Sequence, residues 1–274
     1  MKSTSHRWRV ETRQQLAHFL QDKVDLSGKK IRRLLEQNCC KINDRIERFG
    51  SVWVEKGSVV EFVVHESAKT SWTVLFDTEH FQILDKPVNW VCSESNCERT
   101  FGRKLFLVHR LDKDTTGALL LAKSILIRDE LMALFATREV EKEYLALVDG
   151  VIDETQGTID NFLAKKGSFH GQTIWGSASK GDSAVTYWKV LSRGRLETLV
   201  SCHPLTGRTH QIRVHMAEMG HPILGDRQYA SRFRSKIFAS RPLLHAHRLK
   251  FTHRGIGVDI VCPPPQDFQK ALST

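Results

Sequence analysis

One acidic side chain, Asp112, lies in a polar turn between two short hydrophobic runs of the chain. Residues 105–108 and 118–122 are apolar and predict two strands. The Asp, Thr and Gly residues between them are typical of turns, and Gly117 is free to take a positive φ. Loops at strand ends commonly hold catalytic groups on a rigid scaffold, but an isolated aspartate more often caps its own turn. Other parts of the sequence must therefore decide between a catalytic and a structural Asp112.

Two more motifs follow this turn along the chain. Lys-Glu-Tyr at 142–144 leads into an apolar run, and residues 206–215 are Thr-Gly-Arg-Thr-His-Gln-Ile-Arg-Val-His. Together with His-Arg-Leu-Asp at 109–112 and Thr-Thr-Gly at 115–117, these motifs resemble the RluA-like family of pseudouridine synthases. The resemblance extends upstream to Asp-Lys-Pro at 85–87 and covers most of the chain. The length and order of the motifs make the similarity specific.

The reaction that this resemblance implies is the isomerisation of uridine to pseudouridine in RNA. The bond from ribose to nitrogen 1 of uracil breaks, the base rotates, and the ribose rejoins it at carbon 5, which loses its proton. This chemistry needs a carboxylate, a pocket for the base and exclusion of water, but no cofactor. A glycoside hydrolase usually positions two carboxylates. The motifs here carry a single aspartate for this purpose, Asp112.

By the same resemblance, Asp112, Tyr144 and Arg213 are the catalytic residues. Asp112 matches the family's nucleophile, and Arg213 matches the arginine that pairs with it. Such a fixed cation keeps a carboxylate ionised in a closed pocket. Tyr144 matches the tyrosine that lies against the target base, where its ring can stack and its phenol is a candidate for removing the carbon-5 proton. Outside its motif, a lone tyrosine in an apolar strand would be interpreted as part of the core.

Three residues near these motifs are predicted to bind the RNA. Arg110 resembles the family residue that helps to extrude the uridine and occupies its place, which a planar guanidinium can do by stacking. Arg208 and His210 are expected to shape their loop and to contact the RNA backbone. His210 and His215 lie five residues apart. That spacing places them about 140° apart around a helix, on different faces, so we predict no metal site.

The distribution of charge supports a polyanionic partner. The chain has a net charge of +10 and a pI of about 9.4. The segment 201–254 contains ten Lys or Arg residues and only two acidic ones, and it includes the second motif. A basic surface concentrated in one segment favours contact with nucleic-acid phosphates. We predict RNA as the partner, with ribosomal RNA as the first expectation and transfer RNA as the second.

Residues 12–66 are predicted to form a small separate α+β domain. Apolar residues recur at helical spacing around 16–20 and again at 31–35, and Ser27 is a plausible N-cap for the second helix. Two apolar runs, 51–54 and 59–63, flank a turn containing Gly57 and predict a hairpin. This pattern resembles the RNA-binding domain shared with ribosomal protein S-four. The second helix would present a cationic face to RNA, formed by Lys29, Lys30, Arg32 and Arg33. A solvated basic helix is the alternative.

Residues 72–274 are predicted to form the catalytic domain, after a linker at His65–Ser71. Ser124 is a plausible N-cap for one helix, and residues 209–219 predict an amphipathic helix that ends at Gly220. Strand-like and helix-like pieces alternate, so the class is α+β. The family implies a central, largely antiparallel mixed sheet flanked by helices. One departure is Asn89, where the family usually has glycine, although asparagine tolerates left-handed backbone geometry.

Composition excludes several other classes. No apolar run approaches the ~20 residues that cross a bilayer, and the first residues lack the apolar core of a signal peptide. The six cysteines contain no C-x-x-C pair, which favours reduced thiols in the cytoplasm. We therefore expect a cytoplasmic monomer with no membrane association.

Two other functions are compatible with the same sequence. The chain could be a non-catalytic RNA-binding or ribosome-assembly factor on the same scaffold, although Asp112, Tyr144 and Arg213 are all present. It could also be a glycosylase that releases the base, which only analysis of the product would distinguish from an isomerase.

Overall fold

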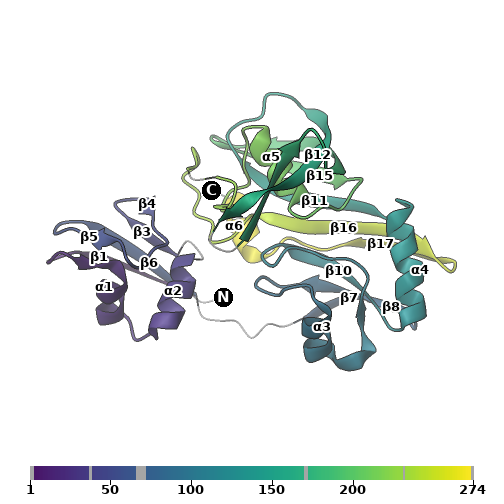
Figure 1. Cartoon of the computed structure of the whole chain (residues 1–274), viewed down its shortest axis with the longest axis horizontal. Helices are drawn as coiled ribbons and strands as arrows, with labels where there is room; N and C mark the ends of the chain where they lie inside the picture. The colour runs from purple at the N-terminus through teal and green to yellow at the C-terminus, as the bar shows by residue number, and fades with distance from the viewer. Residues whose placement is uncertain (1–2, 37–38, 66–71, 170–171, 231, 273–274) are drawn as a thin grey trace. The chain divides into compact units, whose positions relative to one another are not determined.

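The computed structural model describes residues 3–36, 39–65, 72–169, 172–230 and 232–272. The chain divides into two units, Met1–Thr70 and Ser71–Thr274, each with its own core. Figure 1 shows the course of the chain through both units. Of the predicted linker, His65 is the last residue of strand β6, and the remainder lies outside the described residues.

In the part of the first unit that the structure describes, two helices accompany a four-stranded sheet in the order β1-β6-β3-β4. Its elements are β1 (Ser3–Arg9), β2 (Gln14–Gln15), α1 (Leu16–Lys23), α2 (Gly28–Glu36), β3 (Cys40–Ile42), β4 (Arg45–Ile46), β5 (Trp53–Val54) and β6 (Val59–His65). Helix α2 buries Ile31, Leu34 and Leu35, because these residues fall on one helical face. The four predicted cationic residues of the same helix are all exposed.

The predicted hairpin of residues 51–54 and 59–63 is wrong. β5 pairs with β2, whereas β6 pairs with β1 along seven residue pairs and with β3 on its other side. Gly57 does lie in a turn, with φ 89°. The long partner for β6 comes from Ser3–Arg9, which precedes the predicted domain start at residue 12. Local turn residues therefore did not decide which strands pair.

The second unit is built on one mixed sheet in the order β13-β12-β14-β15-β11-β16-β10-β8-β7, with β17 on β16 and β9 on β10. Among its described residues, all strand pairs are antiparallel except β10 with β16. This confirms the predicted fold class. The strands are β7 (Thr73–Asp77), β8 (Phe81–Lys86), β9 (Phe106–Leu107), β10 (Thr116–Ala122), β11 (Glu141–Asp149), β12 (Gln156–Phe169), β13 (Gln172–Ala178), β14 (Asp182–Arg193), β15 (Glu197–Pro204), β16 (Leu244–His253) and β17 (Ile256–Val261).

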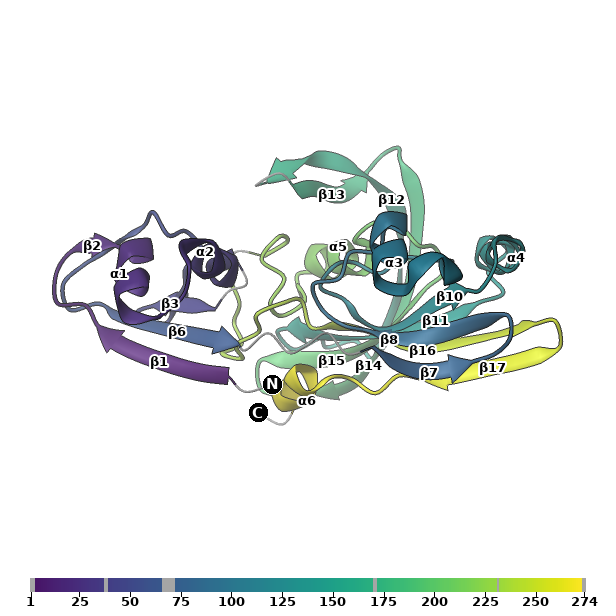
Figure 2. The same cartoon turned by 90° about the horizontal axis from the view of Figure 1, so that it is seen from below.

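Helices flank this sheet. Figure 2 shows α3, α4 and α5 on one side of it, with the β12–β13 hairpin rising on that same side. The helices are α3 (Glu94–Phe101), α4 (Ile125–Ala136), α5 (Gln211–Glu218) and α6 (Gln266–Leu272), with a short 3-10 turn at Gly102–Lys104. Ser124 caps α4 as predicted, because its hydroxyl accepts the Ile127 N–H.

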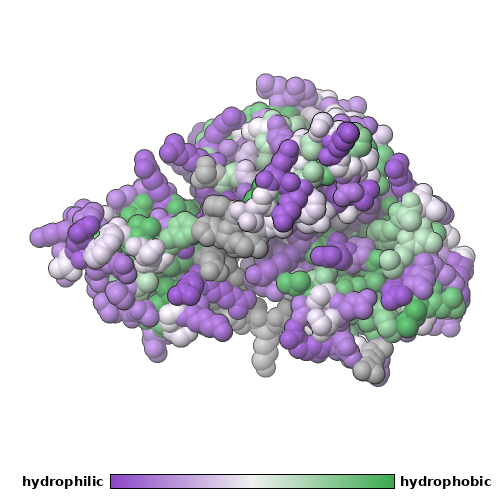
Figure 3. Space-filling model, viewed as in Figure 1, coloured by the Kyte–Doolittle hydropathy of each residue, from purple (hydrophilic) through white to green (hydrophobic). Residues whose placement is uncertain are grey.

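The core of the second unit lies on the two faces of the central strands. Every residue of β10 is buried. This strand has neighbours on both edges, and its alternate residues belong to two different apolar clusters. In the view of Figure 3, hydrophilic residues cover most of the surface of this unit, and apolar residues gather near β8 and α4. Among the described residues, no helix is long and apolar enough to cross a membrane.

Candidate active site

Asp112 lies in the loop between β9 and β10, as predicted. The loop closes as a tight turn, in which the Thr115 N–H donates to the Asp112 carbonyl at 3.1 Å. Gly117 follows with φ 113°, so the positive φ expected of it is present. The Asp112 side chain is 27% exposed, which leaves the carboxylate within reach of a substrate.

Two buried cations hold the main chain of this loop. The fully buried Lys86 donates from Nζ to the carbonyls of Lys113 and Thr115, at 3.0 and 2.8 Å. Arg241 donates from Nη1 to the carbonyl between them, at 3.2 Å. Burial lowers the pKa of Lys86 to about 8, and the carbonyl dipoles around it partly replace water. Sequence reasoning assigned no role to either residue, although Lys86 belongs to the Asp-Lys-Pro motif.

His109 anchors the start of the loop. Its Nε2 accepts the Leu120 N–H at 3.0 Å, and its ring stacks on Phe135 of α4. Burial lowers the pKa of His109 to about 3, so the ring is neutral and Nε2 can act as an acceptor. Nearby, Asn89 has φ 63°, the left-handed geometry anticipated where the family has glycine.

The helix predicted at 209–219 is present as α5. It begins at Gln211 because His210 takes a left-handed backbone with φ 58°, and Gly220 follows it with φ 83°. Ile212 and Met216 are buried, as an amphipathic helix requires, but Arg213 and His215 are buried as well, so these polar residues do not form the solvated face that the prediction implied. The helix packs against β13, β14 and β15, and its polar side chains are satisfied inside the fold.

Arg213 links the motif loop to a second carboxylate. Its Nη1 lies 3.3 Å from Asp112 Oδ2, which brings together the two residues that the motifs predicted as a pair. Its Nε and Nη2 donate to the two oxygens of Asp226 at 2.6 and 2.9 Å, and Nη2 also donates to Gln228 at 2.7 Å. The guanidinium is therefore fixed in its plane by Asp226, and one edge remains for Asp112.

Asp226 is the functional neighbour that sequence reasoning missed. Its side chain is 1% exposed, whereas that of Asp112 is 27% exposed. Burial opposes the charge on Arg213, but the adjacent Asp226 carboxylate outweighs it and raises the pKa of Arg213. The available signal was a lone aspartate in a segment otherwise rich in cations. Its role could not be recognised without its contacts.

Tyr144 lies on β11 at an irregularity in the pairing with β16, and it packs against the apolar cluster beneath the motif loop. Burial raises the pKa of Tyr144, and the nearby charge of Asp112 raises it further. The phenol therefore stays protonated near neutral pH. This arrangement favours contact of the ring with a base and disfavours a phenolate that removes a proton.

The predicted RNA-binding residues differ in their surroundings. His210 places Nε2 4.0 Å from Asp112 Oδ1, so its ring faces the carboxylate. Arg208 is exposed and donates from Nε to the Ser183 carbonyl at 3.0 Å, which fits a residue that shapes its loop. Arg110 is exposed beside Asp112. The four cations of α2 belong to the first unit.

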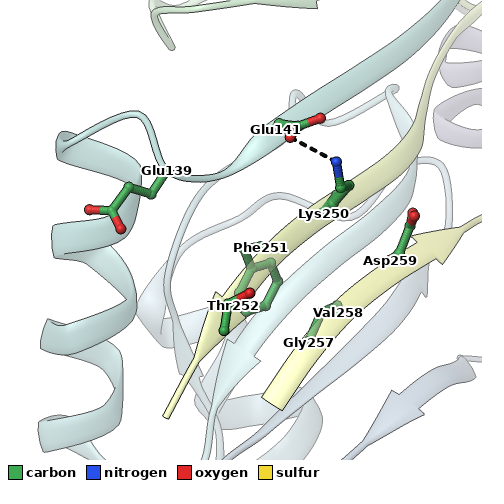
Figure 4. Close-up of a pocket in the computed structure, with 8 residues that line it drawn as sticks. All are labelled: Glu139, Glu141, Lys250, Phe251, Thr252, Gly257, Val258 and Asp259. Atoms are coloured by element: carbon green, nitrogen blue, oxygen red, sulfur yellow. Dashed lines mark hydrogen bonds and ion pairs between the residues drawn. The ribbon is translucent and has the colours of Figure 1, made fainter. Parts of the chain in front are cut away.

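A surface pocket elsewhere in the second unit does not fit RNA. It lies where α4 leads into β11, beside β16 and β17, and Figure 4 shows the Lys250 ammonium paired with Glu141 at 3.0 Å. Three carboxylates against one cation would repel phosphates. The residues that line it are Glu139, Glu141, Lys250, Phe251, Thr252, Gly257, Val258 and Asp259.

The sheet and the motif loop thus place a partly exposed carboxylate, that of Asp112, against a buried guanidinium. A family described as RNA pseudouridylate synthase matches residues 80–218, about half of the chain. Ribosomal large subunit pseudouridine synthase C of Salmonella typhi is 36% identical over 213 residues, which cover 72% of this chain and 67% of that protein. The corresponding synthase D of Pseudomonas aeruginosa is 32% identical over 255 residues, with 80% and 79% covered.

A solved structure agrees with these similarities. Human RNA pseudouridylate synthase domain containing 1 matches with a TM-score of 0.64 and 26% identity, over 74% of this chain and 86% of that one. The protein belongs to the RNA pseudouridylate synthase family. The expectation of an RNA-modifying isomerase is thereby confirmed.

Proposed function

We propose that this protein converts uridines of large-subunit ribosomal RNA to pseudouridine, with Asp112 as the nucleophile. The names of the relatives support ribosomal RNA over transfer RNA as the substrate. The single observation that carries the catalytic assignment is the Asp112 carboxylate, with Oδ2 held 3.3 Å from a buried guanidinium and its side chain still partly exposed. We expect the enzyme to act in the cytoplasm as a monomer.

In this proposal each residue has a role that follows from its surroundings. Arg213 keeps Asp112 ionised and fixes its direction, because Asp226 holds the guanidinium from the opposite side. Tyr144 keeps its hydroxyl proton and provides an aromatic ring against which the extruded base can lie. Arg110, exposed beside Asp112, can enter the space that the uridine leaves in the RNA.

The test replaces Asp112 by Asn, which keeps the shape of the side chain but cannot attack. Pseudouridines are mapped in ribosomal and transfer RNA from cells that carry only the wild-type or only the variant protein. We expect loss of the modification with RNA binding retained. Asp114→Asn is the matched control, because it removes the same charge two residues away. Full modification by Asp112→Asn would refute the assignment of Asp112 as the nucleophile. A loss of pseudouridine confined to transfer RNA would refute ribosomal RNA as the substrate.

This mapping and an analysis of the reaction product separate the alternatives that the sequence left open. A non-catalytic assembly factor predicts unchanged pseudouridine in the Asp112→Asn cells. A glycosylase predicts free uracil and an abasic site in place of the isomer, which product analysis of RNA treated with the purified protein would reveal.

A further inference from the structure

Tyr229 stands at a junction between the catalytic pair and the β12–β13 hairpin. Its ring lies against the Arg213 guanidinium, 5.1 Å from the ring centre. Its hydroxyl is 2.8 Å from His210 Nδ1 and accepts the Trp175 N–H of β13 at 3.3 Å. Gln228 makes a parallel connection, because it accepts from Arg213 and donates to the Thr173 carbonyl of β13.

The positions of the protons follow from these contacts. The Trp175 amide can only donate, so it occupies a lone pair of the Tyr229 oxygen. The hydroxyl proton of Tyr229 therefore needs an acceptor, and among the contacts of the described residues His210 Nδ1 provides it. Burial raises the pKa of Tyr229 to about 12, so this proton is retained near neutral pH. With this proton donated to it, Nδ1 carries a lone pair, and the proton of the neutral imidazole lies on Nε2.

The other ring nitrogen of His210 faces the catalytic carboxylate. Nε2 is 4.0 Å from Asp112 Oδ1, whereas Arg213 holds Oδ2. The opposite tautomer would direct a lone pair of Nε2 at the carboxylate, which is repulsive. Burial and the charge of Arg213 lower the pKa of His210 against the opposing effect of Asp112 and Asp226, which favours the neutral ring. The left-handed backbone of His210, rare for a residue with a side chain, also marks a constrained position.

We propose that Tyr229 is a positioning residue for the isomerisation: its hydroxyl fixes His210 in the tautomer that presents Nε2–H to Asp112. Arg213 and His210 then distinguish the two carboxylate oxygens. Among the described residues, Oδ2 accepts from Arg213, whereas His210 Nε2 is 4.0 Å from Oδ1 and beyond hydrogen-bond distance, so Oδ1 remains available to the substrate. This inference rests on the proposed role of Asp112 as the nucleophile.

The test is Tyr229→Phe, which removes the hydroxyl and keeps the ring against Arg213. Tyr187→Phe is the matched control, because Tyr187 is 47% exposed on β14. We expect kcat to fall about tenfold or more with the KM for RNA nearly unchanged. The acid limb of the pH profile should move to higher pH, since the neutral ring loses a donor at Nδ1 and accepts a proton more readily. Unchanged kcat and pH profile would overturn the proposal.

A second measurement does not depend on turnover. Nitrogen-15 NMR of labelled histidines reports the tautomer of each ring, and the His210 signals are those missing from His210→Gln. We expect the Nε2–H tautomer in wild type and in Tyr187→Phe, and a mixture in Tyr229→Phe. The Nδ1–H tautomer in wild type would overturn the inference even if Asp112 is the nucleophile. If Asp112→Asn remained active while the tautomer were as expected, the proposed function would fail instead.

Discussion

Arg213 contacts two carboxylates that differ in their exposure to water. Asp226 is buried and binds the guanidinium with two hydrogen bonds, whereas Asp112 is partly exposed and accepts one at 3.3 Å. A buried charge is stable only when it is paired. We infer that Asp226 contributes mainly to stability and orientation, and that Asp112 is the carboxylate left for chemistry.

This difference predicts the effect of Asp226→Asn. The variant should lower the free energy of unfolding by about 3 kcal/mol, because it leaves Arg213 buried without its main counter-charge. Urea unfolding measures the loss. Asp259→Asn is the control, since Asp259 also makes two hydrogen bonds to an arginine, Arg248, but on the surface, where it should matter little. Equal losses in the two variants would contradict the inference.

At the scale of elements, the motif loop depends on the parallel pairing of β10 with β16. Gly117 lies opposite Ala246, and a Cβ on Gly117 would be 2.2 Å from the Ala246 carbonyl oxygen. Next to it, the Thr116 hydroxyl donates to Nδ1 of the buried His245 at 2.9 Å. Both contacts join the end of the motif loop to a strand more than 100 residues away in sequence.

Gly117→Ala should therefore separate these strands and reduce both stability and turnover. The expected loss exceeds the ~1–3 kcal/mol of a strained backbone alone. Gly255→Ala is the control in the same unit, because Gly255 also has a positive φ, 77°, but a Cβ there would meet nothing within 4 Å. Thermal unfolding of both variants measures the difference. Similar losses would mean that the close approach of β10 to β16 is not limiting.

At the scale of the whole molecule, buried histidines make stability depend on pH. Burial lowers the pKa of His215 and of His245 to about 4 in the folded protein. The unfolded chain takes up these protons below about pH 6.5, so it binds more protons than the folded state between pH 6.5 and 4. Stability is thus retained above pH 6.5 and falls as the pH drops toward 4.

The free energy of unfolding should fall by about 1.4 kcal/mol per pH unit for each of His215 and His245. Urea unfolding at pH 7 and pH 5 tests this, with His245→Gln expected to reduce the slope. A slope that is the same in this variant would exclude His245 as a source of the acid sensitivity.

The cationic face of α2 predicts a second whole-molecule property, the dependence of RNA binding on salt. Replacing Lys29, Lys30, Arg32 and Arg33 by Gln should weaken RNA binding and reduce the magnitude of the salt slope by about 3 if all four contact phosphates. Turnover at saturating RNA should change little, because Asp112 and Arg213 belong to the other unit. Filter binding from about 50 to about 300 mM salt measures the slope. An unchanged slope would mean that the cationic face of α2 is solvated and does not contact RNA phosphates.

The sequence by itself determined those features that depend on a few neighbouring residues. The turn at Asp112, the positive φ of Gly117, the cap at Ser124 and the end of α5 at Gly220 follow from local backbone and capping preferences. The motifs also placed Asp112 and Arg213 in one site, because their resemblance to a family carries tertiary information that composition lacks.

Tertiary structure alone decided which residues surround that site. The carbonyls of the motif loop are held by Lys86 and Arg241, and Arg213 is oriented by Asp226, although these residues are distant in sequence or unremarkable in type. The predicted hairpin around Gly57 was wrong for the same reason, because β5 pairs with the more distant β2. Strand pairing and buried charge pairs depend on the free energy of the whole fold, in which a distant partner can outweigh a nearby one.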